Sequence, residues 1–129
     1  MDELRVIIAG GRDFDDYDLL KKYVIKIITK KTLTPYSTKI ISGCARGADK
    51  LGEKFAKEMS LDIISFPADW EKFGKSAGYR RNVEMAKFAS EKGKGILIAF
   101  WDGKSKGTNH MINIANQHNL EIYVVSYGD

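Results

Sequence analysis

Five short runs of apolar residues, rich in Ile and Val, are spaced along the chain. Several of them are continuous rather than alternating, which is typical of strands covered on both faces of a parallel sheet. The predicted strands cover residues 5–9, 39–42, 61–66, 95–100 and 121–126.

The segments between these runs have apolar residues at intervals of three or four, the spacing of one buried helix face. Such stripes run from Leu19 to Ile28, through residues 48–59 and 79–89, and through 111–115. Strands and helices therefore alternate along the whole chain. This order predicts an α/β fold: a Rossmann-like three-layer domain with a five-stranded parallel sheet and helices on both faces.

The chain has 129 residues, a length that predicts a single domain over residues 1–129. One cysteine, Cys44, leaves no intramolecular disulfide and no CxxC metal or redox site. The first residues lack a signal-peptide pattern, and the longest apolar run, residues 96–101, is too short to span a membrane. We therefore expect a cytoplasmic protein without a membrane partner.

The net charge is +4 and the pI is near 9.1. A basic chain is compatible with nucleic-acid binding. Much of the excess, however, consists of single lysines on predicted helical faces, where solubility is a sufficient explanation.

Unusual residues gather directly after the predicted strands. The segments are Gly10-Gly11-Arg12-Asp13, then residues 43–49, then Pro67-Ala68-Asp69-Trp70 with residues 78–82, and finally residues 101–108. Ligands of open α/β sheets bind outside the carboxyl ends of the strands, where the strand order switches. The sequence therefore predicts a ligand site at this edge of the sheet.

No GxGxxG and no GxxxxGK[ST] motif occurs, which disfavours a dehydrogenase or a P-loop enzyme. Glycine-rich turns at helix starts can instead hold an anion with backbone N–H groups. Asp15, Asp16 and Asp18 open the first helix, where they suit the helix dipole but would repel phosphate. We expect phosphate between Gly43–Gly47 and Gly107-Thr108.

In these segments the chain resembles the SLOG superfamily, and within it the YspA-like branch. The resemblance rests on residues 7–14, 41–49, 66–70, 77–82 and 101–108, in order along the chain. It implies a Rossmann-like sheet and a nucleotide-derived ligand. The superfamily also includes the LOG phosphoribohydrolases and the single-strand-binding protein DprA.

The LOG enzymes have an arginine-lysine pair at a helix start and a glycine-threonine turn followed three residues later by glutamate. Arg81 matches the arginine, but Asn82 replaces the lysine. Gly107-Thr108 matches the turn, whereas Met111 stands in the glutamate position and Asp102-Gly103 replaces proline-glycine. The resemblance thus implies ligand binding and disfavours LOG-type hydrolysis.

The candidate ligand-binding residues share a position at or next to strand-end loops. They are Gly10, Gly11, Arg12, Asp13, Gly43, Cys44, Arg46, Gly47, Asp69, Trp70, Tyr79, Arg80, Arg81, Asp102, Gly103, Ser105, Gly107 and Thr108. The arginines suit contact with phosphate, or else they form salt bridges with Asp13, Asp49 or Asp69. The aromatic residues Trp70, Tyr79 and Trp101 suit stacking on a base, or else they anchor loops in the core. The catalytic candidates are Arg81, Asp69, Asp102 and His110.

Three functions remain open at this level. The chain binds a mononucleotide, dinucleotide or ADP-ribose-like ligand as a sensor or sequestering module, or it is a glycohydrolase or phosphodiesterase, or it binds single-stranded nucleic acid. No metal site is expected, and Mg²⁺ would enter only through ligand phosphates. We also expect a homodimer or higher homo-oligomer, and a role in phage or bacterial nucleotide signalling is compatible with the resemblance.

Overall fold

The computed structural model describes residues 3–31 and 37–128. It contains one five-stranded parallel sheet, as predicted, and the strand order in the sheet is β3-β2-β1-β4-β5. The strands are β1 (Leu4–Gly10), β2 (Thr38–Ser42), β3 (Asp62–Ser65), β4 (Lys94–Trp101) and β5 (Glu121–Ser126). The helices are α1 (Tyr17–Lys31), α2 (Ala48–Glu58), α3 (Trp70–Phe73), α4 (Ala77–Glu91) and α5 (Lys106–Gln117).

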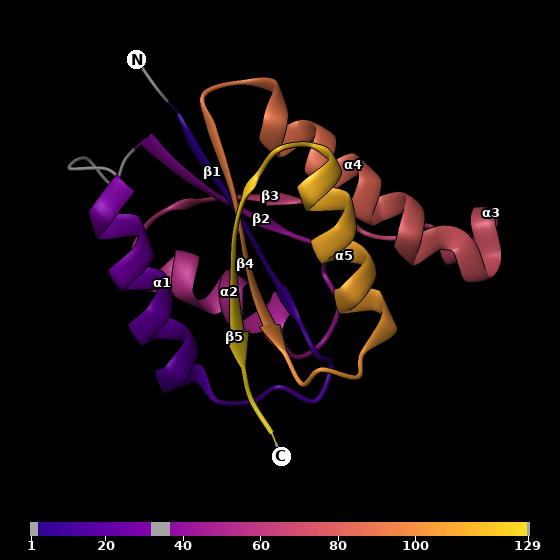
Figure 1. Ribbon diagram of the computed structural model, residues 1–129, viewed down its shortest axis with the longest axis horizontal. Coiled ribbons are helices and arrows are strands. Elements are labelled where there is room, and N and C mark those ends of the chain that lie inside the picture. Colours follow the sequence, from indigo (N-terminus) through magenta and orange to yellow (C-terminus); the bar gives the residue numbers. More distant parts are fainter. Residues whose placement is uncertain (1–2, 32–36, 129) are drawn as a thin grey trace.

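Helices cover both faces of the sheet and form the expected three layers (Figure 1). Helices α1 and α2 pack on one face and α4 and α5 on the other. Successive strand residues alternate between the two cores: Val6 and Ile8 face the α1–α2 core, whereas Ile7 and Ala9 face the α4–α5 core. This two-sided burial explains why the strands read as continuous apolar runs.

One helix was not predicted. Helix α3 has only four residues and is followed by a 3₁₀ turn over Gly74–Ser76. The Asp69 side chain caps it by accepting a hydrogen bond from the Lys72 backbone N–H at 3.1 Å. A helix this short presents no apolar stripe, because the periodicity needs at least two turns to be visible.

The strand order reverses between β1 and β4, which lie side by side in the middle of the sheet. The chain leaves β1 for α1 on one face and leaves β4 for α5 on the other. A crevice therefore opens between the loops that follow these two strands. Within the described residues, no helix is both long and apolar enough to cross a membrane.

Candidate functional site

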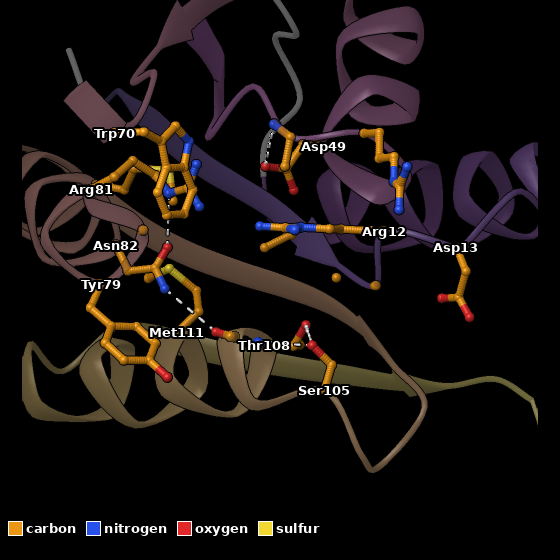
Figure 2. A pocket seen from close by; sticks show the side chains of 18 of the residues that line it. Arg12, Asp13, Asp49, Trp70, Tyr79, Arg81, Asn82, Ser105, Thr108 and Met111 are labelled. Atoms are coloured by element: carbon orange, nitrogen blue, oxygen red, sulfur yellow. Dashed lines mark hydrogen bonds between the residues drawn. The ribbon is translucent and has the colours of Figure 1, made fainter. Parts of the chain in front are cut away.

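A cleft of about 500 Å³ lies at the carboxyl edge of the sheet, over the reversal between β1 and β4. Its wall combines the loop after β1, the loop after β2, helix α3 with the first turns of α4, and the start of α5 (Figure 2). Many of the predicted ligand-binding residues line it, together with Met111 from the expected glutamate position. They are Gly10, Gly11, Arg12, Asp13, Arg46, Trp70, Tyr79, Arg81, Ser105, Gly107 and Thr108. The predicted strand-end site is thus assembled from four separate segments.

The cationic groups of the cleft are available to a ligand. Arg12 and Arg46 are exposed and Arg81 lies in the same lining, and Lys75 adds a fourth cation. None of the ion pairs formed within residues 3–31 and 37–128 involves Arg12, Arg46 or Arg81. Structural salt bridges with the described carboxylates therefore do not occupy these arginines.

Arg81 is held in place by hydrogen bonds from two of its guanidinium nitrogens. Nη1 donates to the backbone oxygen of Gly43, and Nε donates to Oδ1 of Asn82 at 3.1 Å. The first of these bonds ties helix α4 to the loop after β2, and the second lies within α4. A guanidinium fixed at both positions is oriented before a ligand arrives, which lowers the entropic cost of binding.

Asn82 continues this network toward α5. Its Nδ2 lies 3.1 Å from Nδ1 of His110 and 3.4 Å from the backbone oxygen of Gly107. The His110 ring packs on Tyr79 at 4.3 Å between centroids, and burial lowers the pKa of His110. His110 thus supports the wall of the cleft without lining it.

Asp49 is a buried carboxylate in the lining, only 6% exposed. It accepts a hydrogen bond from the Ala45 backbone N–H at 3.2 Å. Burial raises the pKa of Asp49 to about 6, while the Ala45 N–H and the Arg81 charge act in the opposite direction. This group therefore changes its charge near neutral pH inside a cationic cleft.

Two aromatic side chains stand open on the wall. Trp70 is 50% exposed and Tyr79 is 45% exposed, so neither anchors a loop in the core. Trp101 differs: it is half-buried, and its Nε1 donates to the backbone oxygen of Ser105 at 3.1 Å. Trp70 and Tyr79 therefore remain the candidates for stacking, and Trp101 anchors the loop before α5.

The glycines of the first two loops have a packing role. A Cβ on Gly47, which has φ +82, would collide with the backbone of Gly11 and Arg12, and the Ala48 N–H donates to the Gly11 oxygen at 3.2 Å. The loops after β1 and β2 thus lie in direct backbone contact. Gly47 itself does not line the cleft, although Ala45 and Arg46 beside it do.

Other predicted site residues lie outside the lining. Arg80 stacks on the Phe73 ring at 4.4 Å and donates from Nε to Ser76 Oγ at 3.1 Å. Asp69 is the cap of α3. Asp102 accepts hydrogen bonds from the Lys104 and Ser105 N–H groups, which lower its pKa and make it a poor proton donor near pH 7. Gly103 and His110 are also absent from the lining, as are Gly43 and Cys44, which border a neighbouring hollow.

The structure adds lining residues that the sequence did not single out as ligand contacts. They are Ala9, Ala45, Asp49, Lys75, Gly78, Asn82 and Met85. Gly78, Asn82 and Met85 share one face of α4 with Arg81, so helical spacing from Arg81 was a usable signal. Among the described residues, no three His, Cys, Asp or Glu side chains come together to hold a metal ion.

The fold and the cleft together describe an α/β domain with a cationic ligand cleft where the strand order of its sheet reverses. The chain belongs to the YspA, cpYpsA-related SLOG family, whose family model matches residues 4–73. The Gene 61 protein of Mycobacterium phage D29 is 31% identical over 130 residues, which cover 97% of each chain.

A solved structure confirms the fold. DNA processing protein A (DprA) from Streptococcus pneumoniae superposes with a TM-score of 0.69 at 14% identity, over 99% of this chain. This chain spans about half the length of that protein, 51%. At this identity the similarity concerns the fold alone.

Proposed function

We propose that the protein binds a nucleotide or nucleotide-derived ligand in the cleft at the carboxyl edge of its sheet. The observation that carries this proposal is the presence of available cations beside open aromatic rings. Arg12, Arg46 and Arg81 lie in the same wall as Trp70 and Tyr79. Guanidinium groups bind phosphate and aromatic rings stack on bases, and a nucleotide carries both partners.

Polar side chains elsewhere in the lining suit a sugar. Ser105 and Thr108 stand at the start of α5, and Gly107 between them has open space where a Cβ would be. Asp13 also belongs to the lining. Membership of the SLOG family supports the same class of ligand, and binding without turnover agrees with Met111 in the place of the LOG glutamate.

Calorimetric titration with AMP, ADP and ADP-ribose tests the proposal, with inorganic phosphate as the control for simple charge attraction. We expect dissociation constants well below about 1 mM for at least one nucleotide, and weaker binding of phosphate. Failure of all three nucleotides to bind below about 1 mM, where the binding free energy is only about −4 kcal/mol, would overturn it.

Single-stranded nucleic acid is the second candidate, favoured by the exposure of Trp70 and Tyr79 beside a basic groove. Stacking platforms along a cationic track are the usual means of single-strand binding. An oligonucleotide that binds at low salt and dissociates at physiological salt would indicate charge attraction only.

A further inference from the structure

A second hollow of about 560 Å³ adjoins the cleft and is called the side hollow here. It is lined by Arg12, Gly43, Cys44, Ala45, Arg46, Trp70 and Arg81. Five of these residues also line the cleft, so the two spaces share a border rather than lying on separate faces. Each volume is within the range of ordinary small-ligand pockets.

Three of the four cationic residues that line the cleft lie on that shared border. Arg12, Arg46 and Arg81 line both spaces, and no residue that lines the side hollow carries a negative charge. The hydrogen bond from Arg81 Nη1 to the Gly43 oxygen fixes one guanidinium at the boundary itself. In Figure 2 the Arg12 side chain extends into the opening between the surrounding loops. An anionic group is therefore best placed on the border.

The residues that line only one of the two spaces differ in character. Those of the cleft include the Tyr79 ring and the Ser105 and Thr108 hydroxyls, with Asp13, Asp49 and Lys75 as charged groups. Those of the side hollow are Gly43 and Cys44, which are small and neutral. Trp70 lines both spaces and is half-exposed, so its indole can contact a group on either side.

We propose, on the basis of the proposed function, that the preferred ligand carries two groups joined by a phosphate bridge. The phosphate or diphosphate lies on Arg12, Arg46 and Arg81, a nucleoside occupies the cleft, and a second neutral group such as a ribosyl unit occupies the side hollow. A mononucleotide fills only the first of these spaces.

Comparison of ADP with ADP-ribose isolates the contribution of the second group to the binding affinity. Both carry adenosine and a diphosphate, but ADP-ribose has less negative charge and a terminal ribose. We expect ADP-ribose to bind about tenfold or more tightly than ADP in calorimetry. Equal binding, or tighter binding of ADP, would overturn the bridged ligand while leaving the proposed function intact. Absence of binding by both would also overturn the bridged ligand, and absence of AMP binding in addition would overturn the proposed function.

A variant tests whether the second group of the ligand occupies the side hollow. Cys44→Met enlarges a side chain that lines only this space, and we expect it to remove the advantage of ADP-ribose over ADP. Ser60→Met is the matched control, because Cys44 and Ser60 both have positive φ, 66° and 57°, and Ser60 lines neither space. An unchanged ADP-ribose advantage in folded Cys44→Met would contradict the assignment. If Cys44→Met fails to fold, the wild-type comparison decides alone.

Discussion

The side-chain amide of Asn82 lies 3.1 Å from Nδ1 of His110 and joins helix α4 to helix α5 across the cleft wall. Its carbonyl oxygen accepts from Arg81 Nε, which orients the amide so that its nitrogen faces the imidazole. His110 Nδ1 must then be the acceptor, so the neutral ring carries its proton on Nε2. One buried asparagine therefore sets both the orientation of Arg81 and the tautomer of His110.

Replacement of Asn82 by leucine removes these hydrogen bonds while keeping a side chain of similar size. Asn82 is 6% exposed, so leucine would present a buried apolar side chain to Arg81 Nε and His110 Nδ1 in place of their hydrogen-bond partner. We expect the free energy of unfolding to fall by about 1–3 kcal/mol and the affinity for nucleotide to decrease with it. Chemical denaturation measures the first effect and calorimetry the second.

The pKa and tautomer of His110 give an independent test of the contact between Asn82 and His110. Burial lowers this pKa, and a proton on Nδ1 would face the amide nitrogen of Asn82. NMR titration of the wild-type ring should therefore give a value below 6.5, with the proton of the neutral form on Nε2. A pKa above 6.5, or a proton on Nδ1, would contradict the orientation of Asn82.

Two glycine-to-alanine variants separate a packed glycine from an open one. A Cβ on Gly43 would lie 2.8 Å from both Arg81 Nη1 and Asp49 Oδ2, whereas a Cβ on Gly107 meets nothing within 4 Å. We expect Gly43→Ala to lower the free energy of unfolding by about 1–3 kcal/mol and to weaken phosphate binding by displacing Arg81.

Gly107→Ala serves as the stability control, because alanine in a helix is favoured over glycine by about 0.5–1 kcal/mol. Thermal unfolding of both variants gives the comparison. Equal stability of the two would show that the space around Gly43 is not as tight as the Arg81 and Asp49 contacts require.

Asp49 predicts a pH dependence of ligand binding. Its pKa is about 6, so the carboxyl is neutral at pH 5 and charged at pH 8, where it repels a phosphate in the cleft. The charged groups that face it are Arg81, Lys50 and Glu53. ADP-ribose, whose diphosphate does not titrate in this range, should therefore bind more tightly at pH 5 than at pH 8.

The same shift affects stability with a definite sign. A carboxyl whose pKa is raised by folding is more protonated in the native state, so its contribution is favourable at low pH and is lost as the pH rises from about 4 to about 6. With 3.8 as the ordinary value, the loss is about 3 kcal/mol. Asp49→Asn should raise stability at pH 8 and flatten the binding profile; a profile that stays pH-dependent would exclude Asp49 as its source.

Trp70 should report ligand binding directly. It is half-exposed in the lining, whereas Trp101 is fixed by its hydrogen bond to the Ser105 oxygen. We expect a nucleotide to quench fluorescence in the wild type and not in Trp70→Phe. Trp70→Ala should weaken binding by about 1–3 kcal/mol, the usual contribution of one stacked base. Quenching that persists in Trp70→Phe would place the ligand elsewhere.

The strands of the sheet could be predicted from the sequence because burial on both faces requires a continuous run of apolar residues. Ile7 and Ile8 face opposite cores, and both must be apolar, so the strand stands out without any knowledge of its neighbours. The location of the cleft followed from the same topology, since loops after parallel strands meet at one edge.

Roles within the site were harder to predict, because they depend on contacts between distant segments. Gly47 was expected to hold phosphate, but it packs against Gly11 and Arg12. Arg80 and Arg81 are neighbours in sequence, yet only Arg81 lines the cleft, because the Arg80 guanidinium is held on the Phe73 ring and Ser76 Oγ. The sequence suggests Asp49 as a pairing partner for an arginine, but its burial in the lining depends on the fold and has no signal in the sequence.

An NMR titration of isotope-labelled protein with ADP-ribose tests the central claim most directly, because it reports binding and location together. We predict shifts in the amide signals of residues 10–13, 43–49 and 105–108, around the cleft and side hollow. The connection at residues 90–94, at the opposite edge of the sheet, should not respond. Shifts centred on residues 90–94, or none at millimolar ligand, would contradict the account.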